Sequence, residues 1–328
     1  MGAITTEKSY AGQQLSEIFY RPTFSGKSAA ELGMRVVYNL PMPTTLTYWQ
    51  HTGDGIKDYE AGFQGGDGAT RKSKTIDMKK CKVEQNFTPS DYFGTVYEML
   101  TNDPNVNLQD LQGTDLEKAE TELFRRFIRE NIRVQMWVGK AGRTAGGYKA
   151  FDGFLTKCAD TTNYTELHRV AISAAPKSDN IIATLDSVWK AAPAVLKSMK
   201  SGGDLAYFCT SDVIEAYEAF LDSKGNSDAY REMKDGRTVI KYHGIELIEA
   251  QVDSYLAGLT DMPDSFIVLS PKSNLVLAVN TKDLPDADVR MWYNPDELEN
   301  RQRACFLIGT EILDENLVVY GYKAKVGK

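Results

Sequence analysis

The sequence predicts an α+β fold in which an extended β-hairpin and one long helix accompany an inserted α/β module. Three observations support this prediction. A glycine-rich stretch, residues 50–75, stands between two strand-like runs; residues 114–138 form one amphipathic helical pattern; and strand-like and helix-like runs alternate from residue 205 onward. With 328 residues and 42% apolar content, the chain is long enough to bury a hydrophobic core.

The N-terminal segment has no regular pattern. Residues 1–33 mix Gly, Ser, Lys and scattered aromatics without a sustained period, so we expect an extended arm that becomes ordered only against a partner. A short β-prone run follows over residues 34–48, broken by Pro41 and Pro43.

A long hairpin is the next expected element. The run TLTYW precedes residues 50–75 and TIDMKKCKVEQNF follows them, so both flanks read as strands around a mobile tip. A loop of this length without structure of its own is uncommon inside a compact domain. We therefore expect the hairpin to be functional or to be held by another subunit.

Three helices are expected between the hairpin and residue 200. The first covers residues 86–100, and the second runs from a capping Thr114 to Val138 and ends at Gly139. The arginines and glutamates of the second helix read as the ordinary charged face of a half-buried helix. A third helical pattern covers residues 179–199, where Pro193 should kink it or split it.

The rest of the chain predicts a separate α/β module and a return to strands. In the module we expect strands at residues 205–210, 239–250 and 265–270, and one helix at residues 210–223. A further apolar run covers residues 273–280. The last part of the chain reads as two short β runs around a turn at Asp314–Asn316.

The composition argues against several classes of protein. A formal net charge of −7 argues against binding nucleic acid through a broad basic surface. No window approaches the roughly 20 apolar residues of a membrane span, and the start of the chain lacks the apolar stretch of a signal peptide. Four widely spaced cysteines predict reduced thiols and assembly in a cytosol. They are Cys81, Cys158, Cys209 and Cys305.

Motifs of catalysis are weak in this sequence. The glycines of residues 62–68 follow no apolar strand and precede no helix, so they do not match a dinucleotide-binding loop. His51, His168 and His243 have no second ligand at metal-binding spacing. We expect no catalytic residue, metal or cofactor, although an enzyme site assembled from distant residues stays an alternative.

The hairpin carries the residues that we expect to contact another subunit. They are Tyr48, Trp49, Tyr59, Phe63, Arg71, Lys72 and Lys74. Aromatic side chains on an exposed hairpin are costly in water and useful at an interface. The basic residues fit an acidic surface of a neighbour, and a solvated hairpin face is the alternative interpretation.

The order of these parts resembles the major capsid proteins of tailed bacteriophages, which have the HK97 fold. The resemblance lies in CKVEQNFTPSDY, in ELFRRFIRENIRVQMWVGKA as a spine helix, in AFDGFLTKC after it, in GIELIEAQ, and in RACFLIGTEILDENLVVYGY at the end. It implies an N-terminal arm, an extended loop that reaches over a neighbour, a peripheral domain with the spine helix, and an inserted axial domain. The corresponding ranges are 1–37 for the arm, 38–80 for the loop, 81–177 with 289–328 for the peripheral domain, and 178–288 for the axial domain.

The resemblance also implies a function and partners. Members form hexamers and pentamers that close into an icosahedral shell around double-stranded DNA, contacted non-specifically on the inner face. Scaffold, portal and decoration proteins are the other expected partners, and the virion, assembled in the host cytoplasm, is the expected location. No motif marks Lys72 or Lys74 for the covalent cross-link that some members form. An encapsulin-like nanocompartment shares the fold and is the nearest alternative; an α/β enzyme is a remote one.

Overall fold

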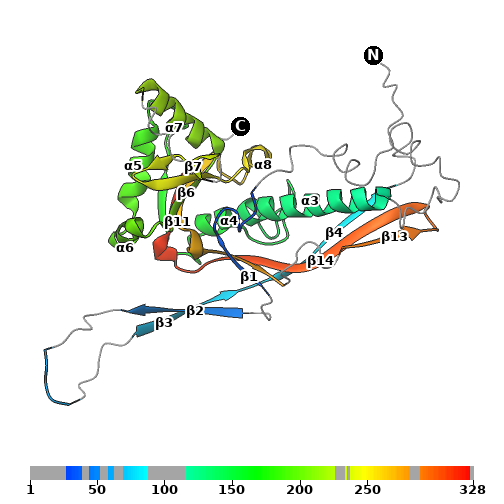
Figure 1. Ribbon diagram of the computed structural model, residues 1–328, viewed down its shortest axis with the longest axis horizontal. Coiled ribbons are helices and arrows are strands. Elements are labelled where there is room, and N and C mark those ends of the chain that lie inside the picture. The colour runs from blue at the N-terminus through cyan, green and yellow to red at the C-terminus, as the bar shows by residue number, and fades with distance from the viewer. Residues whose placement is uncertain are drawn as a thin grey trace.

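The computed structural model describes residues 27–38, 44–51, 58–62, 69–87, 115–225, 233–234, 237–280 and 289–325. Two sheets pack around a shared core, and a two-stranded hairpin projects from them (Figure 1). Most of the expected arm, residues 1–26, lies outside the described residues. So does the helix expected over residues 86–100, apart from its first two residues, which end a strand.

The first sheet has five strands arranged around one long strand. They are β1 (Arg35–Tyr38), β4 (Lys79–Phe87), β12 (Leu275–Val279), β13 (Arg290–Asn294) and β14 (Glu299–Ile312). Strand β4 pairs along one edge of β14, whereas β12 and β13 share its other edge. Strand β1 extends the sheet in parallel to β12.

The second sheet has six strands in the order β5-β15-β11-β6-β10-β9. Their bounds are β5 (His168–Ala171), β15 (Val319–Lys323), β11 (Ser265–Pro271), β6 (Leu205–Cys209), β10 (Ile245–Glu249) and β9 (Lys241–Tyr242). Two further strands, β7 (Met233–Lys234) and β8 (Arg237–Thr238), pair with each other. The pairs β10–β6 and β15–β5 are parallel, whereas β11 pairs antiparallel with both β15 and β6, and β10 pairs antiparallel with β9.

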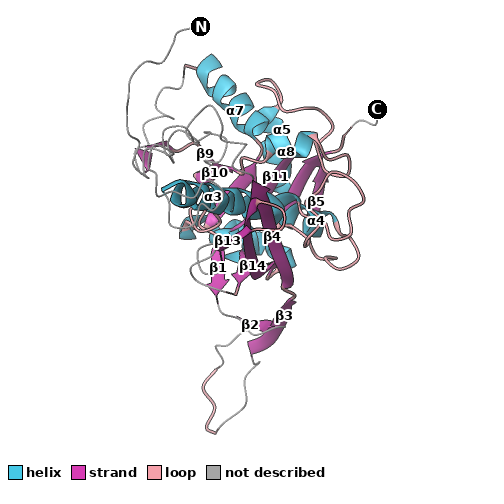
Figure 2. Cartoon of the chain, turned by 90° about the vertical axis from the view of Figure 1, so that its right-hand side faces the viewer, coloured by secondary structure: helices cyan, strands magenta, loops and turns pink. Residues whose placement is uncertain are grey.

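Six described helices surround the sheets, as Figure 2 shows in cyan. They are α3 (Asp115–Val138), α4 (Phe154–Ala159), α5 (Ile181–Ala191), α6 (Ala194–Ser198), α7 (Ser211–Ser223) and α8 (Asp253–Ala257). The predicted long helix is confirmed, and so is the split at Pro193, which precedes α6 in extended conformation. None of the helices in these ranges is long and apolar enough to cross a membrane.

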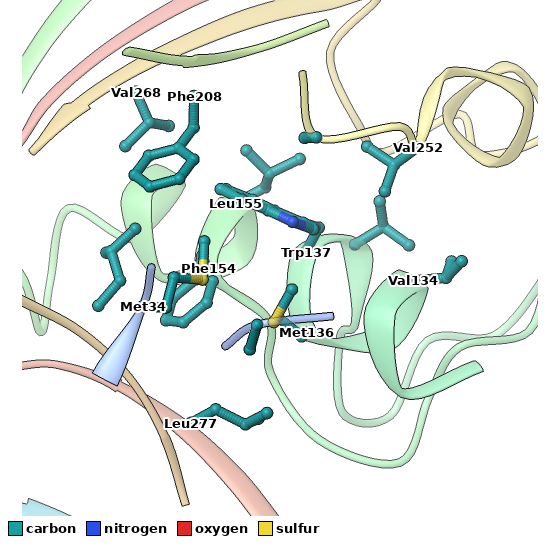
Figure 3. Close-up of a cluster of buried hydrophobic side chains, with 14 of the residues drawn as sticks. Met34, Val134, Met136, Trp137, Phe154, Leu155, Phe208, Val252, Val268 and Leu277 are labelled. Carbon is teal, nitrogen blue, oxygen red and sulfur yellow. The ribbon is translucent and has the colours of Figure 1, made fainter. Parts of the chain in front are cut away.

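One aromatic side chain joins the two sheets. The Trp137 ring, at the end of α3, lies 5.5 Å from the Phe154 ring of α4, centroid to centroid. It lies 5.6 Å from the ring of Phe208 on β6 (Figure 3), and also 5.6 Å from the ring of Phe266 on β11. Because Leu277 of β12 belongs to the same cluster, both sheets and α3 share one core.

The six-stranded sheet is buried on both faces. Phe208 points into the shared core, whereas its neighbours Tyr207 and Cys209 point into a second cluster under α5 and α7. All five residues of β6 are buried, and so are all seven of β11. Strands covered on both sides read as continuous apolar runs, which is why LAYFC and FIVL stand out in the sequence.

The two β runs and the turn expected at the end of the chain are present, but the first run is long and the two runs enter different sheets. Strand β14 has 14 residues and belongs to the five-stranded sheet, whereas β15 belongs to the other sheet. A 3₁₀ turn at Glu315–Leu317 joins them, and Asp314 accepts a hydrogen bond of 3.1 Å from the Asn316 backbone N–H. Each sheet also combines strands from the range expected for the peripheral domain with strands from the range expected for the axial domain. The boundaries between these two domains therefore stay predictions.

Candidate functional site: the hairpin and its base

The expected hairpin is present. Strand β2 (Thr44–His51) pairs antiparallel with β3 (Ala69–Ile76) through eight residue pairs, from Thr44↔Ile76 to His51↔Ala69. At about 3.4 Å per residue the pair extends about 27 Å, and Figures 1 and 2 show it projecting from the body. Strand β3 begins within the stretch expected to be loop, because its residues pair with β2 although they are polar.

The register brings two expected aromatic positions opposite two basic ones. Tyr48 pairs with Lys72, and Trp49 pairs with Arg71. The side chains of Tyr48 and Trp49 lie outside the described part, as does all of Phe63.

The tip and the basic stem of the hairpin face solvent to different degrees. Tyr59, in the described piece of the tip, is 95% exposed. Arg71 is exposed and donates a hydrogen bond of 3.3 Å to the Thr47 hydroxyl across the hairpin. Lys72 is half-buried beside a cleft between hairpin and body. The cleft is lined by Lys72, Ser73, Lys74, Asn163, Thr165, Glu166, Leu313, Asp314 and Glu315.

Lys74 ties the hairpin to its own chain. Its ammonium lies 2.7 Å from a Glu315 carboxylate oxygen and 4.4 Å from the ring centroid of Tyr164. The Tyr164 hydroxyl donates 2.6 Å to Glu311, whose other oxygen lies 2.8 Å from the Lys157 ammonium. Burial and the adjacent Glu311 carboxylate raise the pKa of Tyr164, so the phenol stays a donor.

Apolar packing fixes the base of the hairpin. Ile76 and Met78 are buried against Val276 and Ala278 of β12. Gly309 makes this approach possible, because a Cβ there would lie 2.6 Å from the Asp77 carbonyl oxygen. The alternation of Ile76 and Met78 is visible in the sequence, but their partners lie about 200 residues away and carry no local signal.

Ionisable side chains elsewhere take structural positions. The four cysteines are free, as expected, and burial raises the pKa of the Cys158 thiol to about 12. Within the described ranges, no three His, Cys, Asp or Glu side chains gather as metal ligands.

Comparison with known proteins gives a match in structure but none in sequence. No protein-family model matches the chain, and no curated protein sequence matches it. The capsid of the Myoviridae phage XM1 superposes with a TM-score of 0.54 at 12% identity, over 94% of this chain and 95% of that one. The satellite phage P4 procapsid, solved with its size determination protein, gives 0.53 at 12% over 96% and 99%.

The match runs almost end to end in both chains. The chain has the phage capsid fold. The empty GTA particle capsid has the capsid fold too, at a TM-score of 0.53 and 16% identity over 97% of this chain and 99% of that one. The encapsulin of Synechococcus elongatus gives a TM-score of 0.50 at 12% identity over 100% and 94%. The resemblance seen in the sequence is therefore confirmed at the level of the capsid fold.

Proposed function

We propose that this chain is the major capsid protein of a tailed bacteriophage. It self-assembles as hexamers and pentamers into the icosahedral head shell around double-stranded DNA. The observation that carries the proposal is the superposition on phage capsid chains over more than nine tenths of both partners. The projecting hairpin supports it, because a pair of strands about 27 Å long, whose described contacts with its own chain lie between Lys72 and Met78, is suited to contact another molecule.

The parts of the fold take mechanical roles in this proposal. Helix α3 is the spine of a peripheral domain formed by residues 81–177 and 289–328, and residues 178–288 form the axial domain. Residues 1–37 are the arm and 38–80 the extended loop. Tyr48, Trp49, Tyr59, Phe63, Arg71 and Lys72 contact a neighbouring subunit, whereas Lys74 orients the loop from within the chain.

Other partners follow from the same proposal. The P4 procapsid, one of the structures on which this chain superposes, contains a size determination protein. This supports a scaffold-type partner for this chain as well. Portal and decoration proteins complete the virion, which assembles in the host cytoplasm. The packaged DNA contacts the inner face of the shell without sequence specificity, because an acidic shell does not bind phosphate groups strongly.

Deletion of residues 53–70 tests the role of the hairpin. The deletion leaves six β2–β3 pairs, up to Trp49↔Arg71, and the packing of the hairpin base. We expect a soluble, folded subunit that forms no shells, measured by size-exclusion chromatography and negative-stain electron microscopy beside the wild-type chain. A Gly/Ser replacement of equal length is the control for chain length. Normal shells from the deletion would contradict the role given to the hairpin.

An encapsulin-like compartment is the second candidate, favoured by the match to the Synechococcus shell. The content of purified particles separates the two candidates. Packaged nucleic acid supports the phage head, and a co-purifying cargo enzyme supports the compartment. A monodisperse monomer that never assembles, alone or with an adjacent scaffold protein, would instead favour the α/β enzyme alternative.

A further inference from the structure

Part of the expected arm packs on its own chain. The sequence predicts that residues 1–33 become ordered only against a partner, yet Ala29 and Leu32 are buried in the core that both sheets share. Met34, which follows them, lies in the same cluster (Figure 3). We call residues 27–34 the N-terminal turn; it belongs to the folded body of the subunit.

One polar contact fixes the start of the N-terminal turn. The Lys27 backbone N–H donates a hydrogen bond of 3.0 Å to the side-chain oxygen of Gln251, in the loop between β10 and α8. The backbone of Gln251 has a φ of +55°, in the left-handed region that residues with a Cβ rarely adopt. Such a conformation persists only where the surrounding structure holds it.

Two sets of contacts hold Gln251 in this conformation. The first is the hydrogen bond from Lys27. The second comes from Arg133 of α3, which donates to the backbone carbonyls of Gln251 and of Ala250, the latter at 3.0 Å. Arg133 is buried and paired with Glu130 on the same helix. Gln251 therefore connects the N-terminal turn to the buried ion pair of α3.

A second strained residue adjoins this ion pair. Tyr148 has a φ of +51°, and its ring packs edge to face against Tyr255 with the centroids 5.8 Å apart. The Tyr255 hydroxyl in turn donates 2.8 Å to Glu130. Among the described residues, four that are not glycine have a positive φ, and two of the four border this network. Backbone strain collects in segments that change conformation.

We propose that Gln251 is a switch that couples the docking of the N-terminal turn to the C-terminal half of α3. While the turn is docked, Lys27 and Arg133 together hold Gln251 in its strained conformation. When the turn leaves the core, Gln251 loses one of these contacts and relaxes, and Arg133 then loses its carbonyl acceptors. A buried ion pair with fewer hydrogen bonds is less stable, so residues 130–138 of α3 loosen.

The coupling works in both directions. Because coupling between two sites is reciprocal, a loosened α3 also releases the N-terminal turn more readily. In a shell, a partner that pulled on the residues before Lys27 would loosen α3, and one that held the turn in place would stiffen it. The switch goes beyond the proposed function, because it is a property of the single subunit and is measured without assembly.

Thiol labelling of the unassembled subunit tests the contact from Lys27. The reporter is Ala29→Cys, at a position that is 5% exposed, in a chain whose half-buried Cys81 and Cys305 are changed to serine. A thiol reagent reaches the reporter only when the N-terminal turn opens. Labelling of the buried Cys209, resolved by peptide mapping, measures opening of the six-stranded sheet in the same sample.

Two substitutions at Gln251 separate the contact from the strain. Gln251→Ala removes the acceptor and keeps a Cβ at positive φ, so it should raise the labelling rate of the reporter about tenfold, the size of roughly one hydrogen bond. The labelling rate of Cys209 should not change. Gln251→Gly removes the acceptor and the strain together, so its reporter should be labelled several-fold more slowly than that of Gln251→Ala.

Hydrogen exchange tests whether the effect reaches α3. Leu32→Ala weakens the docking of the turn and should raise the exchange rate of residues 130–138 about tenfold. Leu196→Ala is the matched control, because it truncates an equally buried leucine in the cluster under α5 and α7. It should leave the exchange of residues 130–138 at the wild-type rate while the global fold persists.

Three results would overturn the switch. They are a reporter in Gln251→Ala that is labelled no faster than in the wild type, equal labelling in Gln251→Ala and Gln251→Gly, and unchanged exchange of residues 130–138 in Leu32→Ala. Each of them leaves the proposed shell function standing. A wild-type chain that never assembles would instead overturn the proposed function and leave the switch standing.

Discussion

At the scale of single residues, two charged side chains of α3 depart from the expected solvated face. Glu130 and Arg133 are buried and bind each other, with the Arg133 Nε 3.1 Å from a Glu130 oxygen. Arg133 also donates 3.0 Å to the Ala250 carbonyl, and the Tyr255 hydroxyl donates 2.8 Å to Glu130. This network joins α3 to the loop before α8.

Arg133→Ala should destabilise the chain by about 3–5 kcal/mol, because it leaves the buried Glu130 carboxylate without its cation. Arg126→Ala is the matched control: Arg126 pairs with Glu122 one turn away, but both are about one third exposed. Its cost should stay below about 1 kcal/mol. Urea unfolding followed by circular dichroism measures both, and equal costs would contradict the burial argument.

Alkaline pH should weaken the fold through the buried thiols. The Cys158 thiol has an ordinary pKa near 9, raised by burial to about 12. Between these values the unfolded chain has lost a proton that the folded chain retains, so the free energy of unfolding falls as pH rises. The urea midpoint should be lower at pH 10.5 than at pH 8, and Cys158→Ala should reduce the difference. An unchanged difference in that variant would rule out this thiol as a contributor.

At the scale of elements, the joint between hairpin and sheet depends on Gly309. Gly309→Ala places a methyl group 2.6 Å from the Asp77 carbonyl oxygen and 3.2 Å from the Met78 Cα, both backbone atoms that cannot rotate away. We expect a cost of about 1–3 kcal/mol, as for other overpacked sites. Gly202→Ala, with open space around the new methyl group, is the control. Thermal unfolding measures the stability of both variants. A Gly309 variant as stable as the control would show that the backbone at Asp77 and Met78 shifts to accommodate the methyl group.

At the scale of the whole molecule, the two sheets should unfold together. The Trp137 side chain contacts rings from α4, β6 and β11, and residues of both sheets share its cluster. Scanning calorimetry of the unassembled subunit should give one transition, and Trp137→Ala, which costs about 3–5 kcal/mol, should lower it as a whole. Two separable transitions would show instead that the peripheral and axial ranges are independent units.

Elements with a strong local pattern are predictable from the amino-acid sequence alone. The 3.6-residue period of residues 115–138, the break at Pro193 and the strand-like runs around residues 50–75 each have a cause within a few residues. The order of these elements was enough to indicate the capsid fold.

The partners of the charged residues and the grouping of strands into sheets depend instead on contacts between distant segments of the chain. Lys74 reads as a surface cation in the sequence, yet its partner Glu315 lies 241 positions along the chain. Strands β14 and β15 are neighbours in sequence but enter different sheets, and Arg290 meets Arg303 only because β13 pairs with β14. The physical reason is common to all of these: they depend on contacts between distant segments, and local propensity and periodicity carry no information about such contacts.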